Sequence, residues 1–90
     1  NGVDVNVIQG DTTIIKGEKF DVILANITRN ILLENMPLFC SSLNSQGHLL
    51  ISGFLIKDLE EMNESTVKEE LKRVTYLESE GWCAAEYLKP

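Results

Sequence analysis

The strongest pattern in the chain is an apolar run at residues 20–26 that ends in a polar side chain, Asn26. The residues from 22 to 25 show no polar alternation, which predicts a strand covered on both faces. Such a strand brings Asn26 to its carboxyl end, where open α/β sheets bind ligands. Asn is also favoured at helix starts, so Asn26 could instead cap the following helix. The pattern leaves both interpretations open.

Two further segments predict strands in the first half of the chain. Residues 3–8 alternate apolar and polar side chains and stop at Gln9-Gly10-Asp11, which predicts a short strand with one solvated face, or an edge strand. Residues 48–52 are apolar and are followed by Gly53, which predicts a second buried strand. Between the first two strands, residues 12–19 predict a loop with a brief strand or turn at 13–16.

Helical spacing appears twice. Apolar residues recur at intervals near three and four between residues 28 and 43, which predicts a helix with one buried stripe. Pro37 is expected to kink or restart this helix, because proline removes a hydrogen bond and clashes with the preceding turn. Residues 44–47 predict a polar stop, with Gly47 suited to a helix C-terminal turn. Residues 55–70 predict a second, surface helix.

The chain closes with a predicted hairpin. Residues 71–77 are mixed enough to form either a helix end or a strand, and we favour a strand from about residue 72. Residues 78–81 predict a tight turn, and residues 82–88 a last strand. Strands joined by so short a loop must be antiparallel. The whole order predicts an α/β fold with a mostly parallel sheet, a terminal antiparallel hairpin and helices on both faces.

Composition narrows the class of protein. The 90 residues carry 14 acidic and 8 basic side chains, a net charge of -6, which argues against general nucleic-acid binding and favours a basic partner. Cys40 and Cys83 are far apart and His48 is the only histidine, so no zinc or redox motif can be assembled. No apolar stretch reaches about 18 residues and no signal-peptide pattern opens the chain, so we expect a cytoplasmic protein with reduced cysteines.

Four motifs together resemble the ribosomal protein L-eleven methyltransferase family (PrmA-type), over nearly the whole chain. Each motif alone is weak, and the resemblance depends on their combination. They are Asp-Val-Ile-Leu-Ala-Asn-Ile at the end of a strand, Arg29-Asn30-Ile31-Leu32-Leu33 at a helix start, Gly47-His48-Leu49-Leu50-Ile51-Ser52-Gly53-Phe54, and Glu80-Gly81-Trp82.

The resemblance implies the carboxyl-terminal part of a Rossmann-like class I methyltransferase domain that depends on S-adenosylmethionine. In the family's order, residues 3–8 correspond to the third strand, 20–26 to the fourth, 48–52 to the fifth, and the hairpin to the sixth and seventh. The family grips its cofactor with a glycine-rich loop after strand one and an acid after strand two, yet no Gly-x-Gly pattern occurs here. We therefore expect residues 1–90 to be a fragment of one catalytic domain, without the glycine-rich loop and the N-terminal substrate domain, and inactive alone.

Asn26 matches the family position that binds S-adenosylmethionine, and it corresponds to the first residue of the Asn-Pro-Pro-Tyr-like tetrad of related amino-group methyltransferases. Methyl transfer to nitrogen needs a neutral amine aimed at the sulfonium methyl, so positioning supplies much of the rate. An amide oxygen can accept the amine's hydrogens without offering a competing charge. Here Ile27-Thr28-Arg29 replaces Pro-Pro-Tyr, a departure that fits the ribosomal-protein family. Ile27 and Thr28 are expected near the substrate, and no catalytic residue is assigned.

Other residues carry weaker expectations. Asp11 follows the first strand, where many class I methyltransferases place an acid near the adenine, although an Asp in a turn commonly bonds its own backbone. Arg29 could meet substrate carbonyls or remain a solvated side chain. His48 is expected to be structural, and Phe54 and Trp82 are expected to pack in the core.

Three functions remain open at this stage. The leading hypothesis is a parent protein that transfers methyl groups from S-adenosylmethionine to lysine and N-terminal amino groups of a basic, large-subunit ribosomal protein, without contacting nucleic acid or membrane directly. The second changes the acceptor to an RNA base or a glutamine amide. The third takes the chain as a self-contained, non-enzymatic α/β interaction module. A fragment should expose apolar sheet edges and self-associate through them.

Overall fold

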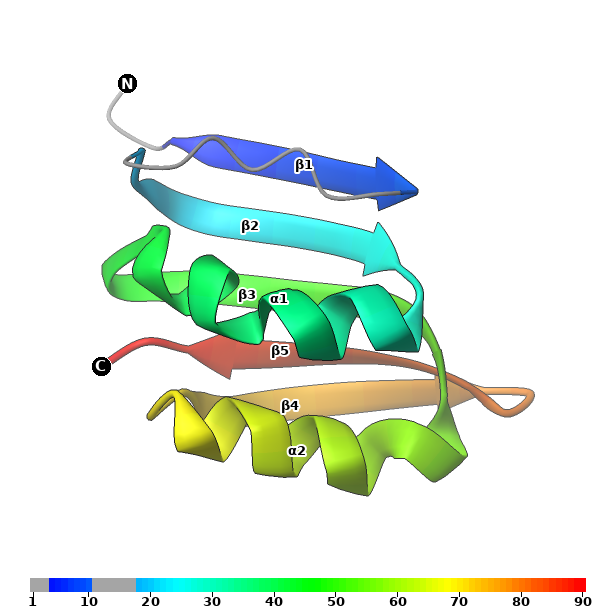
Figure 1. Ribbon diagram of the computed structural model, residues 1–90. Helices are drawn as coiled ribbons and strands as arrows, with labels where there is room; N and C mark the ends of the chain where they lie inside the picture. The colour runs from blue at the N-terminus through cyan, green and yellow to red at the C-terminus, as the bar shows by residue number, and fades with distance from the viewer. Residues whose placement is uncertain (1–3, 11–17) are drawn as a thin grey trace.

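The computed structural model describes residues 4–10 and 18–90, which form a five-stranded mixed sheet and two α-helices (Figure 1). The elements follow the predicted alternation of strands and helices, and the strand or turn expected at residues 13–16 lies outside the described residues. In chain order they are β1 (Val5–Gly10), β2 (Phe20–Ile27), α1 (Arg29–Ser41), β3 (Leu43–Leu55), the short 3₁₀ helix η1 (Ile56–Asp58), α2 (Leu59–Lys68), β4 (Lys72–Ser79) and β5 (Trp82–Leu88).

The sheet has the strand order β1-β2-β3-β5-β4. β1, β2 and β3 are parallel, and β5 runs antiparallel to both β3 and β4. The terminal antiparallel hairpin is therefore confirmed. In the register of the parallel strands, Leu24 lies beside Leu50 and Asn26 lies beside Ser52.

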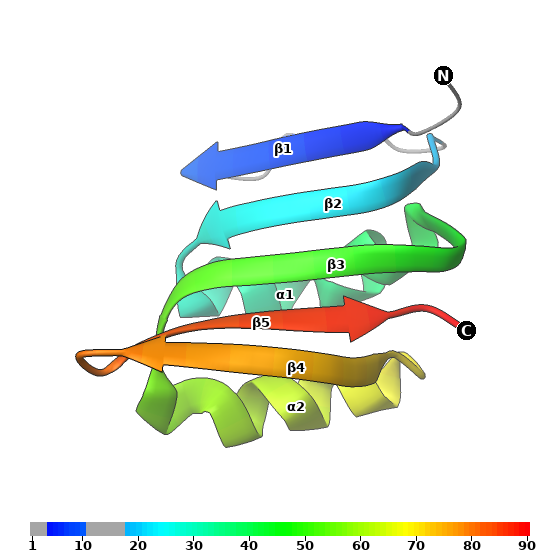
Figure 2. The same ribbon diagram turned by 180° about the vertical axis from the view of Figure 1, so that it is seen from behind.

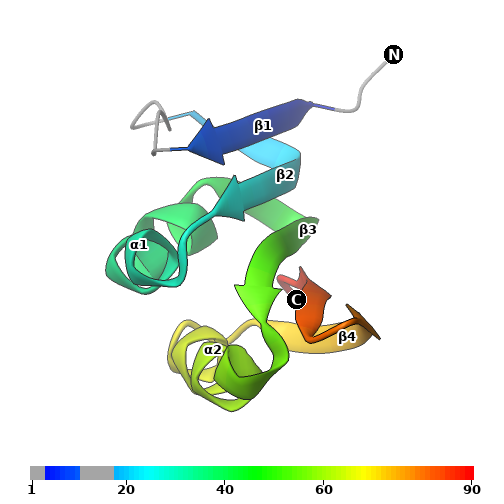
Figure 3. The ribbon, with the colours of Figure 1, turned by 90° about the vertical axis from the view of Figure 1, so that its right-hand side faces the viewer.

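Both helices pack on the same face of the sheet, which corrects the prediction of helices on both faces. Figure 2 shows the sheet from behind with no helix in front of it, and the edge view in Figure 3 places α1 and α2 on one side. The reason is the direction of the chain, because β2-α1-β3 and β3-α2-β4 both step the same way across the sheet. Right-handed crossovers that step the same way place their helices on the same face.

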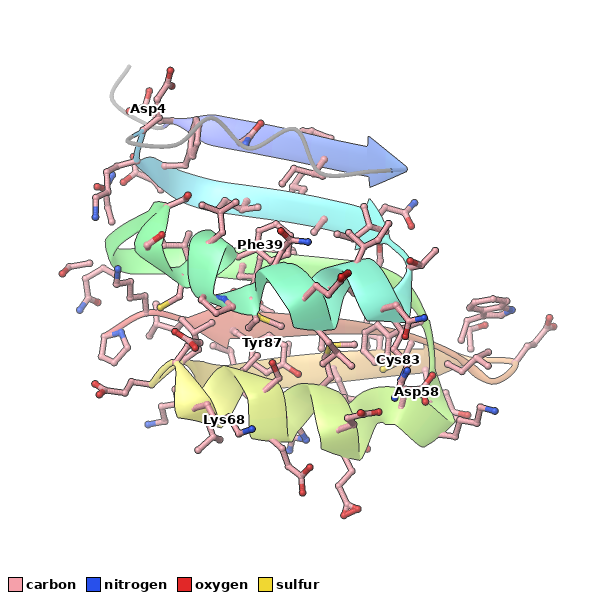
Figure 4. All side chains as sticks on the ribbon, in the orientation of Figure 1. Asp4, Phe39, Asp58, Lys68, Cys83 and Tyr87 are labelled. Carbon is pink, nitrogen blue, oxygen red and sulfur yellow. The ribbon has the colours of Figure 1, made fainter. Side chains whose placement is uncertain are left out.

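The hydrophobic core lies between this helical layer and the sheet. Phe39 of α1, Met62 of α2 and Tyr87 of β5 are completely buried there, and Figure 4 shows the side chains of Phe39 and Tyr87 in this layer. Phe54 is 2% exposed, which confirms its expected place in the core. Alternate positions on β2 and β3 supply the rest of this face, because successive side chains of a strand point to opposite sides.

The opposite face of the sheet is apolar and uncovered in the described part of the chain. Val7, Leu24, Leu50 and Leu77 lie on it, with exposed fractions from 36% for Leu24 to 74% for Leu77. They surround a shallow hollow of about 350 Å³ that reaches Asn26 at its rim. Parallel strands are normally covered on both faces, so this surface is unusual for a sheet of this type.

β3 is longer than predicted and begins at Leu43, so the expected helix stop at residues 44–47 is wrong. Gly47 is needed for a different reason. A Cβ at this position would lie 2.7 Å from the carbonyl oxygen of Asn44, so a close backbone approach inside the strand requires glycine.

Two other expectations about packing need correction. α1 continues through Pro37 to Ser41 and does not restart there, because Met36 and Phe39 anchor both sides of the proline in the core. Trp82 is 56% exposed and is not a packing anchor. It lies beside the β4–β5 turn, which projects past the helical layer (Figure 1).

Candidate functional site

The candidate site is the carboxyl edge of the parallel strands, where β2 ends in Asn26 and Ile27 and β3 reaches Ser52 and Gly53. Asn26 is paired with Gln9 of β1 on one side and with Ser52 of β3 on the other. Its side chain is exposed and lies on the uncovered side of the sheet, because Ala25 and Ile27 point into the core. The strand therefore presents a single carboxamide at the edge where α/β sheets bind ligands.

Asn26 does not cap the helix, so that interpretation is wrong. The N-cap of α1 is Thr28, with extended backbone angles of φ -70° and ψ 156°, and Asn26 is still within β2. Thr28 itself makes no side-chain capping hydrogen bond. Among the described residues, the structure assigns no hydrogen bond to the Asn26 carboxamide either. Within residues 4–10 and 18–90, neither side chain thus has a hydrogen-bond partner.

The carboxamide of Asn26 lies against the backbone of Gly53. Gly53 has a positive φ of 86° and sits at a β-bulge, where the pairing of β3 with β5 shifts between Ser52 and Phe54. The space that a Cβ at residue 53 would take is already filled by Oδ1 of Asn26. In the sequence Gly53 marked only the end of a predicted strand, because its neighbour across the sheet cannot be read from local spacing.

The two residues that follow Asn26 differ in what they can offer a ligand. Ile27 is 4% exposed and packs into the core, so only its backbone reaches the edge. Thr28 is exposed and is the next residue in the chain, at the N-cap of α1. Asp11, the weaker cofactor candidate, lies outside the described residues.

Arg29 joins the two helices. Its guanidinium donates to Glu61 of α2, with 2.9 Å between Nε and Oε1, and Nε lies 3.5 Å from a carboxylate oxygen of Asp58. The hydrogen bond to Glu61 raises the pKa of Arg29. This side chain is thus held at the start of α2 and does not extend over the carboxyl edge.

His48 has an acidic partner that the sequence did not reveal. Its Nδ1 lies 2.6 Å from a carboxylate oxygen of Glu86, which β5 brings across from 38 residues away. Both side chains are on the uncovered face, and His48 precedes the carboxyl end of β3 by several residues. The pair links β3 to β5 and is separate from the edge that holds Asn26.

The described cysteines and acids do not form a second centre. Burial raises the pKa of the Cys40 and Cys83 thiols, so both remain protonated near neutral pH. Over residues 4–10 and 18–90, no group of His, Cys, Asp and Glu side chains is arranged to hold a metal ion. Within the same ranges, no helix has the length and apolar character needed to cross a membrane.

An open mixed sheet with right-handed crossovers and a polar carboxyl edge is typical of α/β proteins, which bind ligands at that edge. The comparison with protein families is more specific. Residues 1–89 match the family model described as ribosomal protein L11 methyltransferase (PrmA), and the chain belongs to this family.

Individual relatives agree with this assignment. The ribosomal protein L11 methyltransferase of Bacteroides fragilis is 37% identical over 90 residues, covering 98% of this chain and 32% of the relative. That of Phocaeicola vulgatus is 34% identical over 86 residues, covering 94% of this chain and 31% of the relative. The crystal structure of ribosomal protein L11 methylase from Lactobacillus delbrueckii subsp. bulgaricus has a TM-score of 0.77 at 26% identity, covering 83% of this chain and 39% of that one. The chain thus spans about a third of the length of the curated relatives it matches.

Proposed function

We propose that the parent protein of this chain transfers methyl groups from S-adenosylmethionine to lysine and N-terminal amino groups of ribosomal protein L11, and that Asn26 contacts the cofactor or the acceptor amine. The observation that carries the proposal is the exposed carboxamide of Asn26 at the carboxyl edge of β2, in a member of a family whose relatives are named for this reaction. Residues 1–90 would then be part of one catalytic domain.

The residues at the edge fit a cofactor and a neutral amine. S-adenosylmethionine, when bound, supplies an electrophilic methyl group on a sulfonium. The Asn26 carboxamide and the Thr28 hydroxyl, neither of them engaged within the described residues, would hold it or the acceptor beside it. The apolar side chain of Ile27 is buried in the core and keeps water out of it. Asp11 would meet the adenine, as the family resemblance implies.

A neutral carboxamide suits an amine acceptor better than a carboxylate does. A lysine with its ordinary pKa of about 10.4 is mostly protonated at neutral pH and has no lone pair to attack with. A nearby carboxylate would favour that charged form further. The Asn26 oxygen can accept a hydrogen bond from an N–H group of the neutral amine. This bond would orient the lone pair of the amine without adding a charge. The amine proton is released to water before transfer.

The surface charge supports a basic protein partner. The first turn of α2 carries Glu60 and Glu61, and the whole chain has a net charge of -6. Opposite charges on two partners increase the rate of their encounter. A nucleic acid would be repelled by the same surface.

The proposal is tested with the full-length protein, methyl-labelled S-adenosylmethionine, and ribosomal protein L11 or ribosomal RNA as acceptor. Label is expected in lysine and N-terminal positions of the protein. Asn26→Ala should lower kcat/KM by about 100-fold, because loss of positioning at a reacting centre costs about that much. Asn26→Asp should also move the pH–rate profile to higher pH, since the carboxylate stabilises the ammonium form of the acceptor.

Asn44→Ala is the matched control. Asn44 carries the same carboxamide at the opposite, amino-terminal end of the parallel strands, where it donates to Asp21 at 3.0 Å. Its replacement should leave the transfer rate within about twofold of the wild type, as expected for a surface change away from the site. Label that appears in RNA or in glutamine amides would contradict the proposed acceptor. Normal transfer by Asn26→Ala would contradict the proposed role of Asn26.

A further inference from the structure

The side chain of Asn26 lies in the space that a side chain on Gly53 would take. The bulge in β3 gives Gly53 a positive φ of 86°, a conformation that residues with a side chain rarely adopt. In this conformation, a side chain at residue 53 would point toward the neighbouring strand β2. Asn26 lies there, because it pairs with Ser52, the residue just before Gly53.

Only Asn26 occupies the space beside Gly53 in the described part of the chain. A Cβ built on Gly53 would overlap with Oδ1 of Asn26 and would lie 3.6 Å from its Cγ, and no other heavy atom there is within 4 Å. The overlap is with the end of a side chain and not with backbone. A methyl group at residue 53 could thus be accommodated by rotating Asn26 away, without moving either strand.

We propose that Gly53 is a positioning residue for methyl transfer, which acts by leaving room for the Asn26 carboxamide at the carboxyl edge. This inference rests on the proposed function, because it assigns Gly53 a role through Asn26. Replacing Gly53 should move the carboxamide out of its place while the sheet stays intact. The reaction should then lose what Asn26 contributes and little else.

Gly81 provides a matched control for the backbone. It has nearly the same positive φ, 85°, but a Cβ there would meet nothing within 4 Å among the described residues. Gly81→Ala and Gly53→Ala therefore impose the same kind of backbone strain, and only Gly53→Ala adds the overlap with Asn26. A difference between the measured effects of the two substitutions therefore reports the overlap with Asn26.

The first measurement uses NMR to follow the side-chain amide resonance of Asn26 in the full-length protein. Gly53→Ala should shift this resonance, and Gly81→Ala should leave it in place. An unchanged resonance in Gly53→Ala would overturn the proposal. This readout does not depend on activity, so it tests Gly53 even if the assignment of a methyl-transfer function fails.

The second measurement is a double-mutant cycle on kcat/KM with labelled S-adenosylmethionine. Gly53→Ala should lower kcat/KM by about 10- to 100-fold, while Gly81→Ala should stay within about threefold of the wild type. In the Asn26→Ala background the overlap no longer exists, so Gly53→Ala should add less than about threefold. Equal losses in both backgrounds would overturn the proposal. If Asn26→Ala alone has no effect, the proposed role of Asn26 in transfer fails instead, and the resonance still decides whether Gly53 places the carboxamide.

Discussion

Asn26 and Gly53 show what a sequence reveals of a site at the scale of single residues. An apolar run that stops at Asn26 predicts a polar group at the end of a buried strand, and β2 confirms that position. The role of Gly53 was not predictable from spacing, because it depends on the pairing of β2 with β3 and on the bulge near Phe54. The acidic partner of His48 was missed for the same reason, since Glu86 belongs to a strand distant in sequence.

Tyr87 carries a prediction at this scale. Its hydroxyl donates to Oδ1 of Asn63 at 2.8 Å, its side chain is completely buried, and burial raises its pKa to about 12. In the unfolded chain the pKa is about 10, so the neutral form is favoured by folding. The resulting stabilisation is complete below about pH 10 and is lost as the pH rises towards 12.

The free energy of unfolding, measured by urea titration across this range, should therefore fall more steeply in the wild type than in Tyr87→Phe. At about pH 8 the variant should be less stable by about 1 kcal/mol, because a buried hydrogen bond is lost. Parallel pH profiles for the two proteins would show that Tyr87 is not responsible.

At the scale of elements, the periodicity of apolar residues located both helices and all five strands. The boundaries were less certain, and the start of β3 at Leu43 was missed because Gly47 resembled a helix stop. Gly47 is required by the carbonyl oxygen of Asn44, a contact that exists only once the strand has formed. Pro37 was a second irregularity, which α1 tolerates while keeping its buried stripe.

Pro37 leads to a prediction about the stability of α1. A proline inside a helix costs about 3 kcal/mol of stability. Replacing it by Ala also makes the unfolded chain more flexible, which lowers stability by up to about 1 kcal/mol. Because the Pro37 side chain is exposed, no packing is lost. Pro37→Ala should thus raise the free energy of unfolding by about 2 kcal/mol.

Urea unfolding of Pro37→Ala provides the measurement, with Glu34→Ala on the same helix as control. Glu34 is also exposed, and its replacement should change stability by less than about 0.5 kcal/mol. A destabilised Pro37→Ala would mean that α1 depends on the proline.

At the scale of the whole molecule, the described residues cover one face of the sheet only. Every described crossover steps in the same direction, so no helix reaches the face that carries Leu24 and Leu50 (Figure 2). The family resemblance adds a second difference, because it implies that β1 and β2 are the third and fourth strands. Two strands separate these positions in the usual doubly wound order, whereas here β1 pairs directly with β2. Neither feature was visible in the pattern of single segments.

The uncovered face predicts association of the isolated chain. Apolar surface of this kind is costly in water, and a second copy can cover it. Sedimentation velocity over a range of concentrations should therefore show species larger than a monomer, and Leu50→Lys should reduce them. Val67→Lys is the control, because Val67 is 68% exposed but lies on α2, away from this face. A chain that stays monomeric at all concentrations would contradict the prediction.

Asn26 is proposed to lie in a methyl-transfer site at the carboxyl edge of the sheet. The most direct test is to titrate the full-length protein with S-adenosylmethionine and follow the side-chain amide resonances of Asn26 and Asn44 by NMR. The Asn26 resonance should shift in proportion to bound cofactor, and the Asn44 resonance, at the opposite edge, should not. Saturation of the protein with an unchanged Asn26 resonance would contradict it.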